Sequence, residues 1–369
     1  MTMAENKDKK VLNVPPLRFP EFSGEWKAET ITDACTLYNG RAYKQEELLS
    51  TGKYQVLRVG NFFTNDSWYY SDLELDEQKT IVKGDLLYAW SASFGPRFWT
   101  GEKAIYHYHI WKVIPKEHID KYYLYYFLYK DSLIIKSKSQ GGTMVHVTKG
   151  DMEKRPMQFP CLEEQRKIAK LLSLLDERIA TQTKIIEKLQ SLIKGLAVAL
   201  TTKEKANIAI SQCLECHSST LQESEVLSSG LCKVFGANGL VGYKDVPQMN
   251  GNAILVIKDG SGVGTVSYAQ GKFSVIGTLN YLTVIGNNDL RYLYFALSVF
   301  NFQPYKTGMA IPHIYFKDYG KAKIYCPSLT EQKRVANVLD KLESKLFVEQ
   351  ELLASFNQQK LYLLGKMFI

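Results

Sequence analysis

The stretch of residues 163–200, EEQRKIAKLLSLLDERIATQTKIIEKLQSLIKGLAVAL, decides the fold of this chain. Its apolar residues recur in alternating steps of four and three, which is the spacing of a heptad seam along one face of a helix. Gln182 is the one polar residue in the seam, and the apolar members are Ile168, Leu172, Leu175, Ile179, Ile186, Leu189, Ile193, Leu196 and Leu200. The pattern predicts a single long helix of about 55 Å, at 1.5 Å per residue.

The same seam occurs a second time, 167 residues further along the chain. Glu349 takes the place of Gln182 and Lys360 that of Ile193, and the other positions are Val335, Leu339, Leu342, Leu346, Leu353, Phe356, Leu363 and Met367. Residues upstream of the two helices match in the same register: His146, Asp151, Lys154, Pro160, Leu162, Glu164, Gln165 and Ala169 correspond to His313, Asp318, Lys321, Pro327, Leu329, Glu331, Gln332 and Ala336. A match of this length indicates a duplicated unit and not a solenoid of short repeats.

The segments before each long helix have a mixed pattern. Short β-prone runs such as 54–59, 85–90, 105–114, 253–258 and 275–285 alternate with turns, and apolar runs at 118–137 and 289–300 favour helices. We therefore predict an α+β fold with two repeated domains, each a mainly β body with packed helices and each followed by a long helix. The two long helices are expected to pair antiparallel as a coiled-coil spacer. The expected order is an N-terminal tail and extended segment over 1–26, a first domain over 27–160, a long helix over 161–202, a second domain over 203–326 and a second long helix over 327–369.

The charge balance favours polyanionic partners. Lys and Arg number 46 against 38 Asp and Glu, a net charge of +8, which suits nucleic acid. No run of eighteen apolar residues occurs, and the first residues, MTMAENKDKK, lack the apolar core of a signal peptide. We expect a cytoplasmic protein without a membrane partner, whose six cysteines are free thiols.

Basic and amide side chains in or beside the expected loops are candidates for contacts with phosphates or base edges, and glycines let a backbone approach a groove closely. In the first domain these candidates are Arg41, Tyr43, Lys44, Arg58, Asn61, Arg97, Lys103, Lys136, Lys138, Gly141 and Gly142. In the second domain they are Lys233, Asn238, Lys258, Gly262, Gly264, Lys272, Lys306, Gly308 and His313. The run DGSGVGT, residues 259–265, lacks the lysine of a phosphate loop and precedes a β-prone segment, so it predicts a glycine-rich hairpin.

Motifs for catalysis or for metal binding are few. Cys213, Cys216, His217 and Cys232 have ligand types that suit tetrahedral zinc, and the first three also spell the c-type haem signature, which would require export. The region around Cys35 in the first domain has no such cluster, so ordinary thiols are the preferred interpretation and metal binding stays open. His146 and His313 have no paired nucleophile or carboxylate, and we expect them to support loops. The sequence contains no Walker A motif, Asn-Pro-Pro-Tyr, H-E-x-x-H or serine elbow, and the chain does not look like an enzyme on its own.

The paired helix starts carry a family resemblance. Pro160 with Leu162, Glu164 and Gln165, and Pro327 with Leu329, Glu331 and Gln332, each follow a variable domain, and the segment LRFPEFSGEW occupies residues 17–26. In this order the chain resembles the specificity subunit of type I restriction-modification enzymes.

The resemblance implies a DNA-binding subunit without catalytic residues of its own, in which each domain reads one half of a split sequence and the helices set the unread gap. It implies that two methyltransferase subunits dock on the helices. It also implies that restriction or motor subunits join the complex for cleavage. The complex would use S-adenosylmethionine, with ATP and Mg²⁺ for restriction, while this chain would bind no cofactor or metal. The helix residues that would pair the spacer and dock partners are Leu172, Leu175, Ile179, Gln182, Ile186, Leu189, Leu339, Leu342, Leu346, Glu349, Leu353 and Phe356.

Two other functions are compatible with parts of the pattern. One is a coiled-coil scaffold for protein partners whose domains do not read DNA, which the salt dependence of duplex binding would distinguish. The other is a single-chain methyltransferase-nuclease, which the missing cofactor loop disfavours.

Overall fold

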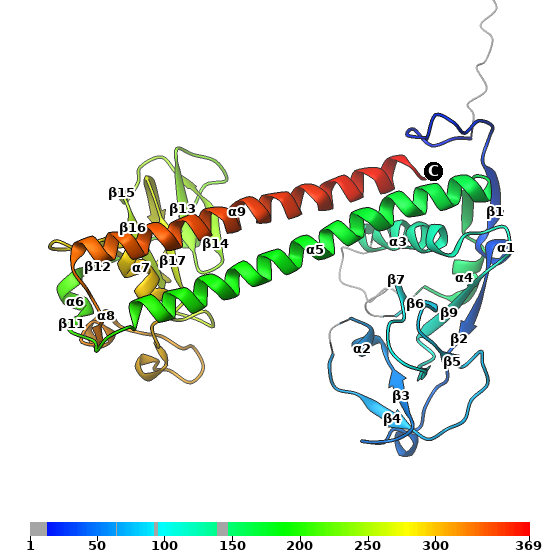
Figure 1. The fold of residues 1–369 in the computed structure, drawn as a ribbon, viewed down its shortest axis with the longest axis horizontal. Coiled ribbons are helices and arrows are strands. Elements are labelled where there is room, and N and C mark those ends of the chain that lie inside the picture. Colours follow the sequence, from blue (N-terminus) through cyan, green and yellow to red (C-terminus); the bar gives the residue numbers. More distant parts are fainter. Residues whose placement is uncertain (1–12, 64, 92–94, 139–146) are drawn as a thin grey trace, which may run out of the picture. The chain divides into compact units, whose positions relative to one another are not determined.

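The computed structural model describes residues 13–63, 65–91, 95–138 and 147–369. The chain divides into two compact units: unit 1 comprises Met1–Thr181 and Leu353–Ile369, and unit 2 comprises Gln182–Leu352. Both long helices, α5 (Leu162–Thr201) and α9 (Leu329–Lys366), contribute one part to each unit (Figure 1). Each unit therefore consists of a globular domain and the two helix segments on which that domain packs.

The globular part of unit 1 is built from ten short strands and four helices. The strands are β1 (Lys27–Thr30), β2 (Cys35–Asn39), β3 (Tyr54–Leu57), β4 (Tyr69–Ser71), β5 (Thr80–Ile81), β6 (Leu86–Ala89), β7 (Gly95–Phe98), β8 (Ala104–Tyr106), β9 (Ile110–Pro115) and β10 (Pro156–Phe159). The α-helices are α1 (Ile31–Ala34), α2 (Val59–Phe63), α3 (Lys121–Lys138) and α4 (Lys149–Glu153), with a 3-10 turn, η1, at Gln45–Glu47. These counts refer to the described ranges of the unit.

Unit 2 repeats this plan. Its strands are β11 (Ile208–Ala209), β12 (Leu214–Ser218), β13 (Cys232–Gly236), β14 (Gly239–Lys244), β15 (Met249–Asn250), β16 (Ala253–Ile257), β17 (Val266–Ala269), β18 (Lys272–Val275), β19 (Leu279–Val284) and β20 (Lys323–Ile324). Its α-helices are α6 (Ile210–Cys213), α7 (Leu290–Ser298) and α8 (Phe316–Tyr319), with 3-10 turns η2 (Glu223–Glu225) and η3 (Gln303–Tyr305).

The two domains have the same sheet topology. In unit 1 the strand orders are β2-β9-β6-β7, β4-β3-β8-β5 and β1-β10, and in unit 2 they are β12-β19-β16-β17, β14-β13-β18-β15 and β11-β20. Every strand thus has a counterpart, including the parallel pairs β3·β8 and β13·β18. The predicted α+β fold with two repeated domains is confirmed. The main difference lies after β3, where α2 and a longer connection replace the tight β13–β14 hairpin.

Two runs that the sequence analysis treated as continuous are each split between two sheets. Residues 105–114 form the end of β8, a turn at 107–109 and most of β9, and residues 275–285 are likewise broken at 276–278 between β18 and β19. The strands on both sides of each break are buried, and only three residues separate them, His-Tyr-His at 107–109 and Ile-Gly-Thr at 276–278, so each pair of strands resembles one run in the sequence. Each break places a three-residue turn where the chain passes from one four-stranded sheet to the other.

The core of each unit joins the domain to the long helices. In unit 1, Trp111 and Tyr123 share a buried cluster with Leu172 of α5 and with Met367 and Phe368 at the end of α9. In unit 2, an equivalent cluster joins residues of α7, such as Tyr292 and Phe295, to Ala197 and Leu339. The N-terminal segment closes the first core, because Trp26 is buried against Tyr123 and the Arg18 guanidinium binds the buried Glu164 carboxylate with contacts of 2.7 and 2.8 Å.

The long helices run antiparallel in each unit. In unit 1, Lys360 of α9 pairs with Asp176 of α5 at 2.6 Å, while Ile168 and Leu172 pack near Leu364. In unit 2, the Gln182 side chain donates to the backbone oxygen of Glu349 at 3.0 Å and to its carboxylate. The predicted antiparallel pairing is therefore confirmed, and the two polar seam residues meet each other.

The glutamine in each helix-start motif ties the long helix to its domain. Gln165 accepts a hydrogen bond from the backbone N–H of Asp120 at 2.8 Å and donates to the backbone oxygens of His118 and Pro160. Gln332 accepts from the Asp289 N–H at 2.8 Å and donates to the Pro327 oxygen at 2.8 Å. Asp120 and Asp289 in turn cap the first turns of α3 and α7. The motif thus links the start of each long helix to the start of the domain helix before it, α5 to α3 and α9 to α7.

Candidate nucleic-acid interface

Three loops meet at the same place in each domain, around the residue that follows the central strand β6 or β16. In unit 2 this residue is Lys258: its N–H donates to the Thr278 oxygen and its oxygen accepts from the Ile314 N–H, both at 2.9 Å. In unit 1 it is Trp90, which makes the corresponding bonds to His109 at 3.1 Å and Val147 at 3.4 Å. We call these places edge 1 (residues 41–43, 90 and 107–109) and edge 2 (residues 258–264, 276–278 and 306–314).

Edge 2 brings six predicted candidates together: Lys258, Gly262, Gly264, Lys306, Gly308 and His313. The loop 259–265 is a hairpin between the antiparallel strands β16 and β17, as the sequence predicted. Its Gly260 N–H donates to the Pro312 oxygen at 2.9 Å, which joins the hairpin to the loop before α8. Lys258 is partly neutralised, because its ammonium group lies 2.7 Å from the Asp259 carboxylate.

The glycines of edge 2 have a packing role as well. Gly264 has a φ of +88°, and a Cβ there would lie 2.8 Å from the Phe302 side chain. Gly308 has a φ of +86°, and a Cβ there would lie 2.4 Å from the Ile311 oxygen. Both positions therefore require glycine for the loops to adopt this backbone, whether or not DNA approaches them.

Edge 1 has aromatic and imidazole rings at positions 90 and 107–109, where edge 2 has Lys258 and the residues Ile-Gly-Thr at 276–278. Trp90 packs edge-on against His109 at 4.9 Å, and the rings of His107, Tyr108 and His109 follow one another at 3.8 to 4.9 Å. Arg41 and Tyr43 lie beside them, with the Tyr43 and His107 rings stacked at 6.3 Å. Burial, with the nearby charges of His109 and Arg58, lowers the pKa of His107 to about 4, so the ring is neutral at physiological pH. Such rings can stack on bases and, when neutral, offer hydrogen-bond acceptors.

The sequence analysis missed four residues of edge 1: Trp90, His107, Tyr108 and His109. They belong to runs interpreted as continuous strands, 85–90 and 105–114. The available signal was the sequence His-Tyr-His at 107–109, because two imidazoles around a tyrosine are unusual in the middle of a buried strand.

Other candidates of the first domain gather around α2. Arg58 stacks on Tyr69 at 4.2 Å, Arg97 lies 5.0 Å from the Phe63 ring, and the Asn61 amide donates to the backbone oxygens of Asn65 and Ser67. Burial, with the nearby Arg97 charge, lowers the pKa of Lys136 in α3. The rings of Tyr69 and Phe63 orient the two guanidinium groups, although the Arg58 Nε is buried and has no hydrogen-bond partner among the described residues.

The remaining candidates are more scattered. Lys44 is exposed and lies 3.8 Å from Glu46, Lys103 lies over Tyr54, and Lys138 ends α3. Asn238 lies in the β13–β14 turn and Lys272 begins β18, both away from the bonds that define edge 2. Gly141 and Gly142 lie outside the described residues. The role of every one of these residues in DNA contact stays a prediction.

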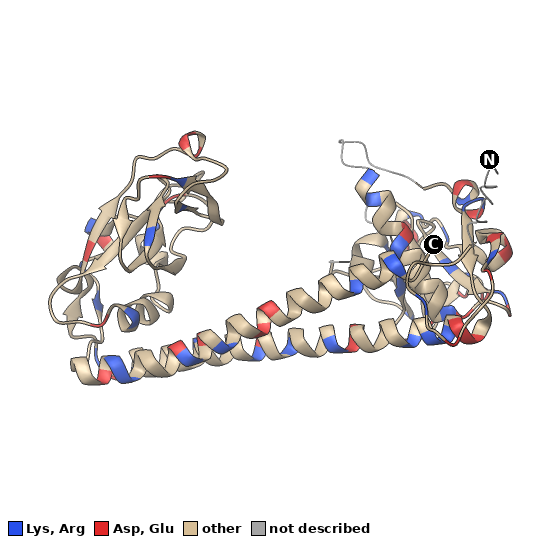
Figure 2. Cartoon of the chain, turned by 90° about the horizontal axis from the view of Figure 1, so that it is seen from above, with Lys and Arg blue, Asp and Glu red and all other residues tan. Residues whose placement is uncertain are grey.

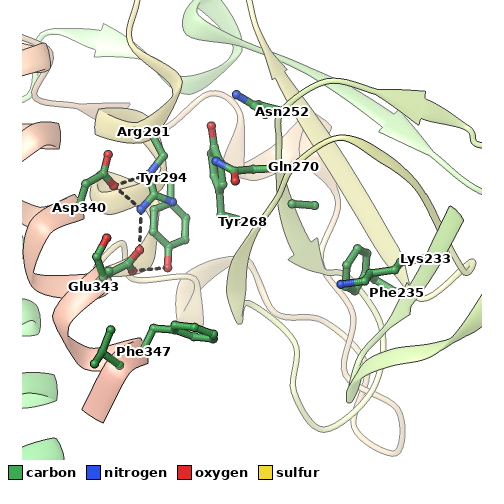
Figure 3. A pocket seen from close by; sticks show the side chains of 13 residues that line it. Lys233, Phe235, Asn252, Tyr268, Gln270, Arg291, Tyr294, Asp340, Glu343 and Phe347 are labelled. Atoms are coloured by element: carbon green, nitrogen blue, oxygen red, sulfur yellow. Dashed lines mark hydrogen bonds and ion pairs between the residues drawn. The ribbon is translucent and has the colours of Figure 1, made fainter. Parts of the chain in front are cut away.

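Lys233 lines a cavity of about 900 Å³ between the domain of unit 2 and α9 (Figure 3). Its wall is dominated by Arg291, which donates to Asp340 and Glu343 of α9 at 2.6 Å each and lies over the Tyr268 ring at 4.3 Å. The Tyr294 hydroxyl donates to Glu343 at 2.8 Å. These contacts join α7 to α9, so Arg291, Tyr294, Asp340 and Glu343 hold the unit together on this side of the cavity.

The four candidate metal ligands of the second domain are separated. Cys213 is buried in the core beside α7, Cys232 is buried in the other sheet, and the His217 ring stacks on Tyr281 while bonding Thr283 at 2.9 Å. Within the described ranges, no group of three or more His, Cys, Asp or Glu side chains is arranged to hold a metal ion. The same ranges contain no helix long and apolar enough to cross a membrane.

The spacer residues named from the sequence lie in the seam between α5 and α9. Leu172, Leu175, Gln182, Ile186, Leu339 and Glu349 are buried, and Ile179, Leu189, Leu342, Leu346, Leu353 and Phe356 are half-buried. Other apolar side chains of α9 point to solvent, among them Phe347 and Val348 in unit 2 and Leu361 and Tyr362 in unit 1, each more than half exposed. Lys and Arg are interspersed with Asp and Glu along both helices (Figure 2).

Comparison with known proteins gives one consistent family. A model described as the type I restriction modification DNA specificity domain matches residues 23–191 and 217–358. The chain is 32% identical over 191 residues to the type I restriction enzyme MjaVIII specificity subunit of Methanocaldococcus jannaschii, a match that spans 51% of this chain and 44% of that protein. It is 24% identical over 110 residues to the EcoprrI specificity subunit of Escherichia coli, covering 30% and 27% of the two chains. These matches span less than half the length of either relative.

Solved structures show the same fold over nearly the whole chain. The type I restriction-modification S subunit of M. genitalium has a TM-score of 0.67 at 20% identity, covering 96% of this chain and 99% of that one. A chain from a structure of the type I R-M system on complex assembly and conformational transition has a TM-score of 0.55 at 17% identity, with the same coverage. With the family model matched in both domains, this chain belongs to the family of type I restriction modification DNA specificity domains.

Proposed function

We propose that this chain is the DNA sequence-specificity subunit of a type I restriction-modification complex, and that each domain reads one half of a bipartite target. The observation that carries the proposal is one topology built twice with different side chains at equivalent edges. Trp90 and the rings at 107–109 in edge 1 correspond to Lys258 and the turn 276–278 in edge 2. One scaffold with two different surfaces is what two unlike half-sites require, since base readout depends on the side chains presented in the groove.

Affinity would come chiefly from charge. The net charge of +8, with half-buried cations such as Arg41 and Lys306 at the edges, would supply the salt-dependent, sequence-independent part of binding. The rings of edge 1 and the polar groups of edge 2 would add base contacts. The chain itself would bind no cofactor, and partner subunits would use S-adenosylmethionine, with ATP and Mg²⁺ for restriction.

We propose that partner subunits dock on the exposed apolar residues of the helices. The seam residues are already buried or half-buried against each other, so they set the spacer and contribute little free surface. Phe347 and Val348 in unit 2, and Leu361 and Tyr362 in unit 1, remain exposed and suit a protein partner. We propose that two methyltransferase subunits use the helices in this way, and that motor subunits join them.

Exchange of one domain tests the proposal. Residues 31–150 are replaced by the same domain of a relative with another target, and the modified sites in host DNA are then sequenced. We expect one half of the recognised sequence to change while the other half stays the same. A change in both halves, or in neither, contradicts the assignment of one half-site to each domain.

Two controls separate the alternative functions. The purified chain is incubated with duplex DNA and S-adenosylmethionine, and methyl transfer without a partner would establish a single-chain enzyme. The chain with methyltransferase subunits is also titrated with DNA at low and high salt. Absence of binding at low salt would favour a protein scaffold.

A further inference from the structure

The loop before α8 in edge 2 is a rigid hairpin with an apolar tip. Thr307 and His313 exchange both backbone hydrogen bonds, at 2.9 and 2.8 Å. Gly308 turns the chain at a φ of +86°, where a Cβ would lie 2.4 Å from the Ile311 oxygen and 2.9 Å from the His313 ring. The Pro312 oxygen accepts from the Gly260 N–H at 2.9 Å, which fixes the hairpin to its neighbour. These bonds close the base of the hairpin and join it to the loop 259–265.

The side chains at this tip face solvent. Met309 is 104% exposed and Ile311 68% exposed. A turn with only a structural purpose is usually built from polar residues, because exposed aliphatic groups give up favourable burial. Residues 307–312, TGMAIP, contain no charged side chain, so the tip cannot neutralise a phosphate. Its chemistry matches the apolar parts of a base pair, which are the thymine methyl group in the major groove and the ring faces at an opened base step.

Comparison of the two repeats favours DNA over a protein partner. The residues that frame the hairpin recur in the sequence, since Gly308 and His313 match Gly141 and His146 of the first repeat, which lie outside the described residues. The tip differs: Met309, Ala310 and Ile311 replace Gly142, Thr143 and Met144, which lie outside the described residues. Equivalent partner subunits docking on the two repeats would require the same tip twice. Two unlike half-sites would require a different tip in each repeat.

We propose that Met309 and Ile311 form an apolar reading tip, which contacts the hydrophobic surface of a base pair in the half-site of the second domain. The inference rests on the proposed function and assigns specificity to two residues without charge or hydrogen-bonding side chains. The backbone bonds of the hairpin position the tip, and the two side chains make the discriminating contact.

The experiment uses the complex of this chain with its methyltransferase subunits and the target sequence found by sequencing modified sites. Affinities for a target duplex and for a non-target duplex are measured at one salt concentration for wild type, Met309→Ala, Ile311→Ala and Met309→Leu. Each alanine variant is expected to lower the ratio of target to non-target affinity about tenfold, the usual loss for one poorly matched base pair, and to leave non-target affinity unchanged. Met309→Leu, which keeps the apolar bulk, should retain most of the ratio.

Leu231→Ala is the matched control, because Leu231 is 83% exposed in the same domain and lies outside edge 2. This variant should keep the wild-type ratio. Two further arms identify the contacted surface. If the contact is a thymine methyl, uracil in place of one thymine should reduce wild-type binding as much as the alanine variant does, with no further loss on combining the two changes. If the tip opens a base step, 2-aminopurine at that step should brighten with wild type and not with the variant.

The outcomes separate failure of the inference from failure of the proposed function. A wild-type complex without any preference for its target would refute the proposed function, and the reading tip with it. A normal wild-type preference that the alanine variants retain would overturn the reading tip alone. Alanine variants that weaken assembly with the methyltransferase subunits, while the assembled complex keeps its preference, would assign the tip to protein contact.

Discussion

Replacement of Gln165 by alanine should lower the stability of unit 1, and the size of the loss follows from the hydrogen bonds that the Gln165 side chain makes. The side chain is fully buried and makes three bonds, to the backbone N–H of Asp120 and to the backbone oxygens of His118 and Pro160. Each lost bond costs about 1 kcal/mol net, so Gln165→Ala should lower the free energy of unfolding of unit 1 by about 3 kcal/mol. For a unit of this size the melting temperature should fall by about 6 to 12 °C.

The effect should be confined to one unit. Gln332→Ala removes the equivalent bonds to Asp289 and Pro327 and should destabilise unit 2 instead. Gln190→Ala, at an exposed position of the same helix α5, is the matched control and should change stability by less than about 0.5 kcal/mol.

Hydrogen exchange measured by mass spectrometry separates the two units. With Gln165→Ala we expect faster exchange in the first turn of α3, and with Gln332→Ala in the first turn of α7. If Gln165→Ala behaves like Gln190→Ala, or accelerates exchange equally in both units, then the glutamine does not anchor its own domain and the reasoning is wrong.

Two further predictions concern the edges. Because the pKa of His107 is lowered to about 4, and the unfolded chain takes up that proton near pH 6.5, unit 1 should lose stability as pH falls from about 6.5 to about 4. His107→Asn should reduce this slope in urea unfolding, and an NMR titration that places the pKa of His107 near 6.5 would contradict the expectation. Gly308→Ala should increase hydrogen exchange at the His313 amide much more than Gly260→Ala does at the same amide. Both glycines have positive φ, and only Gly308 lacks room for a Cβ. Similar effects of the two changes would show that left-handed strain alone governs the hairpin.

The long helices were predictable because the residues that each helix buries recur at a regular spacing within one continuous segment. The duplication was predictable because the same spacing occurs twice. A helix buried on one face leaves a period in the sequence, and a polar exception such as Gln182 shows at once. The repeat placed Gln182 and Glu349 at equivalent positions of the two copies, and the structure shows that these two residues meet. Nothing beyond local periodicity was needed for this part.

The edges were harder to predict because they assemble residues that are distant in sequence. Lys258, Thr278 and Ile314 are joined by backbone hydrogen bonds, and no local sequence pattern predicts which loops will come together. The turn at 107–109 was hidden for a related reason, because the strands on both sides of it are buried on different sheets and only His-Tyr-His separates their apolar residues. Sequence reasoning therefore found cations near the edges and missed the rings of edge 1.

The contact between Gln182 and Glu349 has a consequence for how halves of this molecule would associate. The amide and the carboxylate are complementary only when α5 meets α9, because one donates and the other accepts. Two copies of α9 paired antiparallel would bring two Glu349 carboxylates together at the same level, and their repulsion would oppose self-association. Two copies of α5 would place two amides there, which can satisfy each other. The pair therefore favours α5–α9 pairing over α9–α9 pairing, and it makes the first half of the molecule the better dimer-former if the two halves are ever separated.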